Sequence, residues 1–386
     1  MNNHATNDVE IKIVSSPTGD PYLLTPGPLT TSPTVKQAML HDFGSRDKTF
    51  IDLNAGVLKR LVTIVNGEDT HVAVPLQGSG TFTVEAMMGC FVPADGKVLI
   101  LINGAYGHRI AKICDYYKRD YIIQECAEDE PVDTDQLDKT LADDATISHV
   151  VVVYCETTSG ILNPLKELSD TVARHQRSLL IDAMSAFGAL PLDSKEIAFD
   201  AMAASSNKCL EGAPGMGYCI ARISALEQTK GNSLSLSLDL YEQWVAMEKN
   251  RQWRFTPPTH VILAFSQALN EFDEEGGVEG RGGRYGANCN LLVSGMREMG
   301  FKTLLPDELQ APIIITFHMP TNPEFEFADF YDGLSKRGYV IYPGKLTVAE
   351  SFRMGCIGRL NQVQMQGALD AVGEILSEFG IDRITN

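Results

Sequence analysis

Short apolar runs alternate with longer amphipathic stretches along most of the chain. Continuous apolar runs of this length are typical of strands that are buried on both faces of a parallel sheet. They occur at 98–102, 150–154, 178–182 and 199–204, and helical stretches such as 165–175 lie between them. This alternation predicts an α/β fold with a mainly parallel sheet and crossover helices.

The two ends of the chain carry further predicted elements. Ser32 and Pro33 are typical of a helix start, and that helix is expected to run to about residue 40. The glycine-containing segment 271–286 indicates a transition to a smaller unit. Apolar runs at 311–317 and 339–342 and a helix over 362–379 give that unit an α+β pattern. We therefore expect an N-terminal segment (1–24), a large domain (25–275) and a small C-terminal domain (276–386).

Composition and charge narrow the class of protein. A net charge of −18 argues against nucleic acid as a ligand, because binding to phosphate backbones requires concentrated Lys and Arg. Hydrophobic residues make up 44% of the chain, and no apolar run approaches the roughly 20 residues of a membrane span. The first ten residues lack an apolar signal core, and the eight cysteines lack metal-type spacing. We expect a cytoplasmic enzyme with reduced thiols and no metal.

Two chemically useful side chains follow apolar runs. Asp182 ends the run at 178–182, and Lys208 comes shortly after the run at 199–204. Open α/β sheets bind ligands at the carboxyl ends of their strands, so both residues are expected at one crevice. Pyridoxal chemistry needs this pair, because the amine forms a Schiff base and the carboxylate keeps the pyridine nitrogen protonated. The alternatives are a solvated loop lysine and a capping or turn aspartate.

A glycine-rich turn over 76–81 precedes an apolar helix over 82–88. Glycines let the backbone approach an anion, and the N–H groups of a first helical turn point towards it. The turn is neither a Walker motif nor a complete dinucleotide fingerprint, because Thr83 stands where a third glycine is required. It therefore predicts a phosphate cradle, with an ordinary tight connection as the alternative.

The chain resembles the class V aminotransferases of fold type I nearly from end to end. The segments at 235–241 and 340–345 resemble the branch of this family that acts on 2-aminoethylphosphonate. The other matching segments are 23–31, 77–80, 103–107, 156–160, 182–185, 207–209, 253–256 and 352–355. The resemblance implies a seven-stranded, mainly parallel sheet flanked by helices, a smaller α+β domain, pyridoxal 5'-phosphate as cofactor, and a homodimer with active sites at the subunit interface.

The resemblance also assigns roles to residues around the cofactor. Lys208 would form the Schiff base and transfer the proton, and Asp182 would pair with the pyridine nitrogen. Tyr106 would stack on the ring, and Thr157 would bond its phenolic oxygen. The residues implied for the phosphate are Ser79, Gly80, Thr81 and Asn207, together with Thr256 reaching the phosphate of the other subunit.

On the substrate side, Arg353 is expected to grip a carboxylate or phosphonate, helped by the backbone N–H of Gly27. The segment 41–47 departs from the tryptophan-containing pattern of some phosphonate enzymes, and its Arg46 is a further candidate contact. The implied reaction, a step of phosphonate degradation, moves the amino group of 2-aminoethylphosphonate to pyruvate and gives phosphonoacetaldehyde and L-alanine. The alternatives are an alanine–glyoxylate or serine–pyruvate aminotransferase and a non-catalytic protein that binds pyridoxal phosphate.

Overall fold

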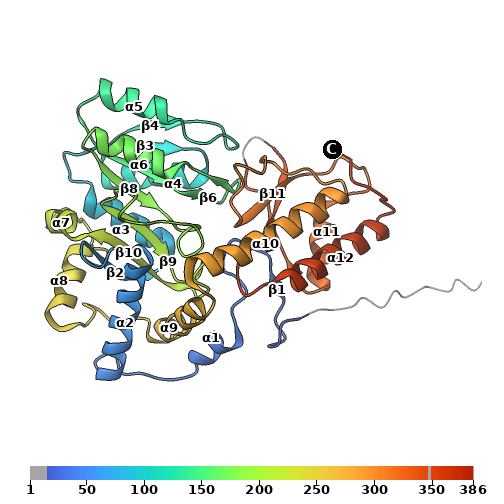
Figure 1. Cartoon of the computed structure of the whole chain (residues 1–386), viewed down its shortest axis with the longest axis horizontal. Coiled ribbons are helices and arrows are strands. Elements are labelled where there is room, and N and C mark those ends of the chain that lie inside the picture. Colours follow the sequence, from blue (N-terminus) through green and yellow to red (C-terminus); the bar gives the residue numbers. More distant parts are fainter. Residues whose placement is uncertain (1–14, 347–348, 386) are drawn as a thin grey trace, which may run out of the picture.

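A seven-stranded sheet forms the centre of the computed structural model, which describes residues 15–346 and 349–385 (Figure 1). Six strands are parallel to one another, and β10 is antiparallel to both of its neighbours. The order across the sheet is β2 (His71–Gly78), β10 (Gly215–Arg222), β9 (Ala201–Ser205), β8 (Ser178–Asp182), β5 (Ile147–Val153), β3 (Lys97–Ile102) and β4 (Asp120–Glu125). The predicted α/β class and mainly parallel sheet are confirmed.

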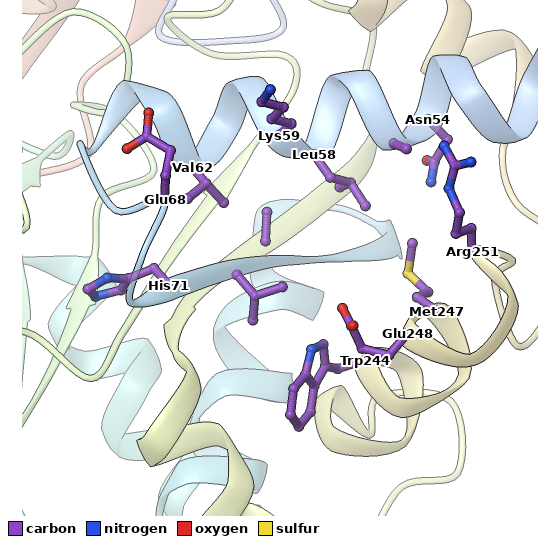
Figure 2. A pocket seen from close by; sticks show the side chains of 13 residues that line it. Asn54, Leu58, Lys59, Val62, Glu68, His71, Trp244, Met247, Glu248 and Arg251 are labelled. Atoms are coloured by element: carbon purple, nitrogen blue, oxygen red, sulfur yellow. The ribbon is translucent and has the colours of Figure 1, made fainter.

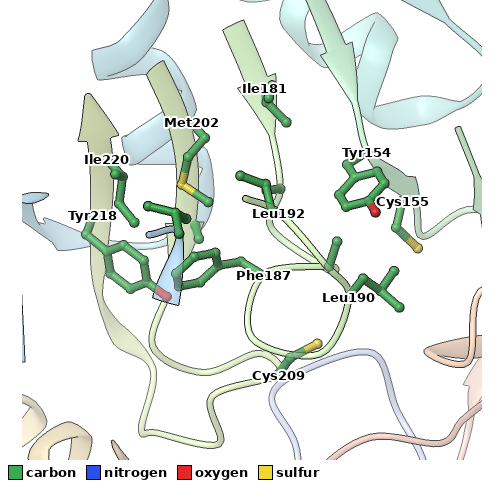
Figure 3. Close-up of a cluster of buried hydrophobic side chains, with 14 of the residues drawn as sticks. Tyr154, Cys155, Ile181, Phe187, Leu190, Leu192, Met202, Cys209, Tyr218 and Ile220 are labelled. Carbon is green, nitrogen blue, oxygen red and sulfur yellow. The ribbon is translucent and has the colours of Figure 1, made fainter. Parts of the chain in front are cut away.

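Helices cover both faces of this sheet. The central strands contain continuous apolar runs, so successive side chains of these runs enter opposite cores. The first core lies under α3 (Gly80–Phe91) and α4 (Ala105–Tyr117). The second lies under α2 (Lys48–Ile64), α5 (Thr134–Asp143), α6 (Leu165–Arg174) and α9 (Thr259–Glu274). Figure 3 shows part of this second core, where the rings of Phe187 and Tyr218 meet edge to face with centroids 5.7 Å apart.

The C-terminal part of the chain has a sheet and a core of its own. Its antiparallel sheet has the order β11 (Ile314–His318), β14 (Ser351–Gly355) and β13 (Tyr342–Pro343). The helices α10 (Gly277–Glu298), α11 (Phe327–Lys336) and α12 (Gln362–Glu378) contribute to the same core. Near the N-terminus, β1 (Tyr22–Leu23) pairs in parallel with β12 (Tyr339–Val340), and Tyr22 and Leu24 are buried in this C-terminal core. Figure 1 shows α10 running between the two parts.

The remaining elements are short or peripheral. They are α1 (Pro33–Ala38), β6 (Cys155–Glu156), β7 (Ile161–Leu162), α7 (Ile223–Leu226), a 3-10 turn (Glu227–Thr229) and α8 (Leu240–Asn250). The Ser32 side chain caps α1 by accepting from the Val35 N–H, as the Ser-Pro pair predicts. The predicted turn over 76–81 is shorter than expected, because β2 continues to Gly78 and α3 begins at Gly80.

The division into domains remains a proposal. We propose a boundary at the junction of α9 and α10, where Gly276 and Gly277 have φ values of +97° and +69° that disfavour other residues. The two apolar cores lie mostly on opposite sides of this boundary, which supports it, while Tyr285, Ala311, Ile313 and Ile357 belong to the core of the large sheet. Residues 1–10, for which the sequence predicts no export signal, lie outside the described residues. None of the helices in 15–346 and 349–385 is long and apolar enough to cross a membrane.

Candidate active site

Lys208 lies in a loop three residues after β9, at the carboxyl edge of the large sheet. Its Nζ donates a 2.8 Å hydrogen bond to the Pro26 carbonyl oxygen, so the N-terminal turn lies directly against the amine. On the other side, the Glu211 N–H donates to the Lys208 carbonyl oxygen at 2.8 Å. Burial lowers the pKa of the Lys208 ammonium to about 8. A solvated loop lysine is therefore the wrong description of this residue.

Asp182 ends β8, the strand next to β9, and aligns with Ala203 of that strand. Its side chain is only 5% exposed, and its Oδ1 accepts a 3.0 Å hydrogen bond from the Met184 N–H. Burial raises the pKa of the carboxyl to about 6, against the opposing effects of that hydrogen bond and of the charges on Arg109 and Lys208. The two side chains predicted from strand ends thus lie at one edge of the sheet and influence each other's charge.

The turn between β2 and α3 lies at this same edge. Gly78 has φ +138°, and Ser79 occupies the N-cap position of α3 without making a side-chain capping hydrogen bond. A Cβ at Gly80 would overlap the Met184 Sδ, so the start of α3 lies close to the chain that follows Asp182. The first-turn N–H groups of a helix have no intrahelical acceptors, and they favour an anion. The predicted cradle therefore lies beside Asp182.

Tyr106 is in the first turn of α4, and a buried carboxylate holds that turn in place. Glu156 Oε2 accepts from the Tyr106 N–H at 3.2 Å, and Oε1 accepts from the Thr158 N–H at 3.1 Å. Burial raises the pKa of the Glu156 carboxyl. A Cβ at Gly104 would overlap the Glu156 side chain, so only glycine permits this approach. Glu156 belongs to a matching segment, but the sequence alone did not indicate this role.

Two further cations surround Tyr106, and sequence reasoning missed both. The Arg109 guanidinium carbon lies 4.6 Å from the ring centroid of Tyr106, and its Nη1 donates to Thr81 Oγ1 at 2.9 Å. Lys345 Nζ lies 4.8 Å from the same centroid. Helical spacing was an available signal for Arg109, because it follows Tyr106 by three residues and so shares its face of α4. For Lys345, the available signal was its place in the matching segment 340–345.

Arg353 enters the site from the middle of β14, between Thr316 and Tyr342 on the neighbouring strands. It is 6% exposed, and burial lowers its pKa. Its Nη1 donates to the Thr157 carbonyl oxygen at 2.9 Å, which joins the C-terminal unit to the segment that follows β6. The Thr157 hydroxyl lies 3.2 Å from Ser185 Oγ. The structure thus brings Arg353 and Thr157 together.

Behind the site, two arginines of α10 and two glutamates form a group that we call the α10 charge cluster: Glu211, Glu275, Arg281 and Arg284. Arg281 and Glu211 are buried, and the other two are partly buried. Arg281 Nε donates to Glu275 Oε2 at 2.6 Å, and Arg284 Nη2 donates to Glu211 Oε1 at 2.7 Å. Burial tends to raise the pKa of Glu275, but the two guanidinium groups outweigh this effect and hold that pKa at about 2.

The α10 charge cluster also binds the backbone on both sides of the site. Arg281 Nη1 donates to the Cys209 carbonyl oxygen at 2.5 Å, next to Lys208. Arg284 Nη1 donates to the carbonyl oxygens of Gly358 and Leu360, which follow β14, at 2.6 and 2.8 Å. The cluster therefore ties the lysine loop to the chain that follows the Arg353 strand.

The other predicted residues differ in their placement. A Cβ at Gly27, where φ is +110°, would lie 2.7 Å from Lys208 Cδ, so this backbone borders the lysine. Asn207 precedes Lys208 and is partly buried. Arg46 and Thr256 are exposed, and within the described ranges neither hydrogen-bonds a residue of this site. No group of His, Cys, Asp and Glu in the described part of the chain has the arrangement of a metal site.

A separate pocket lies between α2, β2 and α8 (Figure 2). Its lining includes Leu58, His71, Trp244 and Met247. It contains none of the candidate active-site residues described above.

Comparison with known proteins identifies the family. The chain matches the model for class V aminotransferases over residues 59–352. It is 52% identical over 362 residues to the 2-aminoethylphosphonate–pyruvate transaminase of Pseudomonas fluorescens, covering 94% of this chain and 98% of that protein. The identity to the Pseudomonas aeruginosa protein of the same name is 51% over 361 residues, covering 94% of this chain and 97% of that protein.

Solved structures show the same fold at low sequence identity. Ureidoglycine–glyoxylate aminotransferase from Bacillus subtilis has a TM-score of 0.86 at 20% identity, over 95% of both chains. Pyridoxamine–pyruvate aminotransferase from Mesorhizobium loti has a TM-score of 0.86 at 22% identity, over 96% of this chain and 95% of that one. By sequence and by fold, this chain belongs to the class V aminotransferase family.

Proposed function

We propose that this protein is a pyridoxal phosphate-dependent transaminase that moves the amino group of 2-aminoethylphosphonate to pyruvate. The products are phosphonoacetaldehyde and L-alanine, and the reaction is a step of phosphonate degradation. The observation that carries this proposal is the identity of about half of all positions, over 94% of the chain, to proteins named 2-aminoethylphosphonate–pyruvate transaminase.

The residues present fit pyridoxal 5'-phosphate. The uncapped first turn of α3, with Ser79, Gly80 and Thr81, would hold the phosphate, with Asn207 beside the lysine and Thr256 from the other subunit. Asp182 uses Oδ1 for the Met184 N–H, which leaves Oδ2 for the pyridine nitrogen. Tyr106 would stack on the ring, and the Thr157 hydroxyl would bond its phenolic oxygen. When bound, the cofactor supplies an electron-withdrawing ring and carries the amino group between the two substrates.

The chain's own residues move and hold the protons. With its pKa near 8, Lys208 has a useful fraction of neutral amine near pH 7, so Nζ would take the proton from the substrate carbon and deliver it to the cofactor carbon. Asp182 is ionised above pH about 6 and keeps a proton on the pyridine nitrogen. The Pro26 carbonyl oxygen accepts from Nζ at 2.8 Å and so orients the amine.

Arg353 binds the anionic end of each substrate in turn. Its guanidinium is anchored through Nη1 on Thr157 and through Nε on the Pro343 carbonyl oxygen at 3.2 Å. A planar guanidinium offers paired donors to a carboxylate or a phosphonate, so one residue serves both the donor and the acceptor. Gly27 would add a backbone N–H, and Arg46 is proposed as a further contact with the donor.

A homodimer with shared active sites is part of the proposal. Several large apolar side chains in the segment 234–255, which precedes Thr256 in the sequence, are exposed in the single chain: Leu234 (73%), Leu236 (74%), Val245 (40%) and Phe255 (49%). Exposed apolar groups of this kind favour a protein interface. The pocket of Figure 2 borders the same segment through α8.

The test is alanine formation from pyruvate with 2-aminoethylphosphonate as the amine, together with the absorption spectrum before and after the amine is added. We expect alanine to form, and the visible band of the bound cofactor to be lost on adding the amine. Lys208→Ala should lack both the band and the activity. Absence of reaction with the phosphonate, combined with ready use of serine, or of alanine with glyoxylate, would reject the proposed donor in favour of the related aminotransferases.

A further inference from the structure

The proposed reaction sets an electrostatic problem that Arg353 alone does not solve. The inference that follows rests on the proposed function. Pyruvate presents a planar carboxylate with one negative charge. A phosphonate is tetrahedral, has three acceptor oxygens and, like a phosphate monoester, carries between one and two negative charges near neutral pH. One guanidinium balances one charge, and the protein as a whole has a net charge of −18. A selective donor site therefore needs a second local cation.

Lys345 lies on the same hairpin as Arg353. In this hairpin Tyr342 is paired with Arg353, and Pro343 with Phe352. The Gly344 N–H then donates to the Ser351 carbonyl oxygen at 2.8 Å, and a Cβ at Gly344 would overlap that backbone. Lys345 thus leaves the strand pair immediately after a tight, hydrogen-bonded position. Its Nζ reaches 4.8 Å from the ring centroid of Tyr106, the proposed cofactor-stacking residue.

Most other charged groups at this place already have hydrogen-bond partners. Arg46, proposed above as a further contact with the donor, is exposed and hydrogen-bonds no residue of this site within the described ranges. Arg109 donates to Thr81 Oγ1, Arg353 donates to two carbonyl oxygens, and Glu156 accepts from backbone N–H groups behind Tyr106. Lys345 differs from them, because within the described part of the chain its ammonium has the face of Tyr106 as its contact and no hydrogen-bond or ion-pair partner. Lys345 is exposed, but partial desolvation and the charges of Arg109 and Arg353 lower its pKa, while Glu156 has the opposite effect.

We propose that Lys345 is the second cation of the donor site and selects a phosphonate over a carboxylate. An ammonium on a flexible stem is a point charge with three donors, which suits tetrahedral oxygens better than planar ones. Arg353 meets the anion of either substrate, and Lys345 swings from Tyr106 to the phosphonate when the donor binds. With pyruvate, Lys345 stays over the ring.

The experiment compares Lys345→Met with Lys166→Met in the holoenzyme. Lys166 is exposed on α6 and pairs with Asp170, so its replacement changes the net charge equally and at a distance from the site. Each half-reaction is followed separately by absorbance. For Lys345→Met we expect kcat/KM for 2-aminoethylphosphonate to fall on the order of 10- to 100-fold, and kcat/KM for pyruvate to change less than about 3-fold. Lys345→Arg should retain most of the phosphonate preference.

A binding measurement tests recognition of the anion separately from the rate of amino transfer. Ethylphosphonate and propionate lack an amine, so calorimetric titration of the holoenzyme reports recognition of the anion alone. We expect Lys345→Met to weaken the binding of ethylphosphonate about 10- to 100-fold and the binding of propionate less than about 3-fold. Equal losses for both ligands, no loss, or the same loss in Lys166→Met would overturn the role of Lys345. If the wild-type enzyme does not react with 2-aminoethylphosphonate, the proposed function itself fails, whatever the variants do.

Discussion

Replacing an arginine of the α10 charge cluster should destabilise the protein, and the burial of the cluster sets the size of the loss. Arg281 is fully buried; its Nε bonds Glu275, its Nη1 bonds the Cys209 carbonyl oxygen, and Nη1 lies 3.7 Å from Glu211 Oε1. Arg281→Met removes one positive charge and leaves the buried Glu211 and the partly buried Glu275 facing one guanidinium. Removing one partner of a buried ion pair costs about 3–5 kcal/mol, because the remaining charge stays desolvated.

That cost converts into a shift of the melting temperature. With an unfolding entropy of about 2.1 cal/mol/K per residue, the 386 residues give about 0.8 kcal/mol/K. We therefore expect Arg281→Met to lower Tm by about 4–6 °C. The assay is thermal unfolding followed by circular dichroism, at one protein concentration and with the cofactor at a fixed excess, because both stabilise the folded state by mass action.

A double-variant cycle tests the electrostatic explanation. Glu211→Gln, which keeps an acceptor for the Tyr285 hydroxyl, removes one of the two carboxylates, so the combination with Arg281→Met restores a neutral cluster. We expect the double variant to lose about 1–2 kcal/mol less than the sum of the single losses. Arg297→Met is the control, because Arg297 is on the same helix in an exposed pair with Asp307 and should shift Tm by about 1 °C or less. Additive losses, or equal shifts for Arg281→Met and the control, would refute the reasoning.

Four further predictions concern the site. Gly27→Ala places a Cβ 2.7 Å from Lys208 Cδ at a φ of +110°, so kcat should fall on the order of 100-fold while circular dichroism shows a folded protein; unchanged kcat would contradict the close approach. The pKa of Lys208 is lowered from its ordinary 10.5 to about 8, so its neutral fraction falls as the pH drops below 8; the rate at which apoprotein captures the cofactor should decrease about tenfold per pH unit below pH 7, and a flat stopped-flow profile from pH 6 to 8 would count against that pKa. Arg353→Lys loses the paired donors and should raise KM for both substrates about 10- to 100-fold, whereas an effect on one substrate alone would argue against a shared anchor. Thr256→Ala should weaken cofactor binding, and mixed dimers with Lys208→Ala chains should show the defect in the active site formed by the Thr256→Ala chain's partner; a defect confined to the chain that carries the substitution would reject the contact across subunits.

The local sequence pattern was sufficient to predict the strands that hold Asp182 and Lys208. Asp182 and Lys208 each follow an apolar run, and the parallel pairing of β8 with β9 brings the ends of those runs together. The Ser32 cap and the final helix also follow from nearby residues. These features depend on interactions within a few residues, or on the general rule that parallel strands share one carboxyl edge.

The unpredicted features depend on contacts between distant segments. Glu211 and Arg281 are 70 positions apart, and nothing in either neighbourhood indicates that they meet in the interior. The antiparallel direction of β10 is set by its pairing with β2 and β9, because an apolar run has no direction of its own. Glu156 was part of a matching segment, but its contact with the Tyr106 N–H requires α4 and β6 to be placed first.

The pairing of β1 with β12 affects the order in which the protein can mature on the ribosome. Tyr22 emerges early, yet its partner Tyr339 follows 317 residues later. At about 5–20 residues per second, translation needs about 15–60 s to cover that interval. During this time Tyr22 and Leu24 have been synthesised, but the C-terminal core that buries them has not. The strands of the large sheet, from His71 to Arg222, are made earlier than that core and can already pair with one another. Tyr22 and Leu24 can therefore reach their buried positions only after the C-terminal part of the chain has been made.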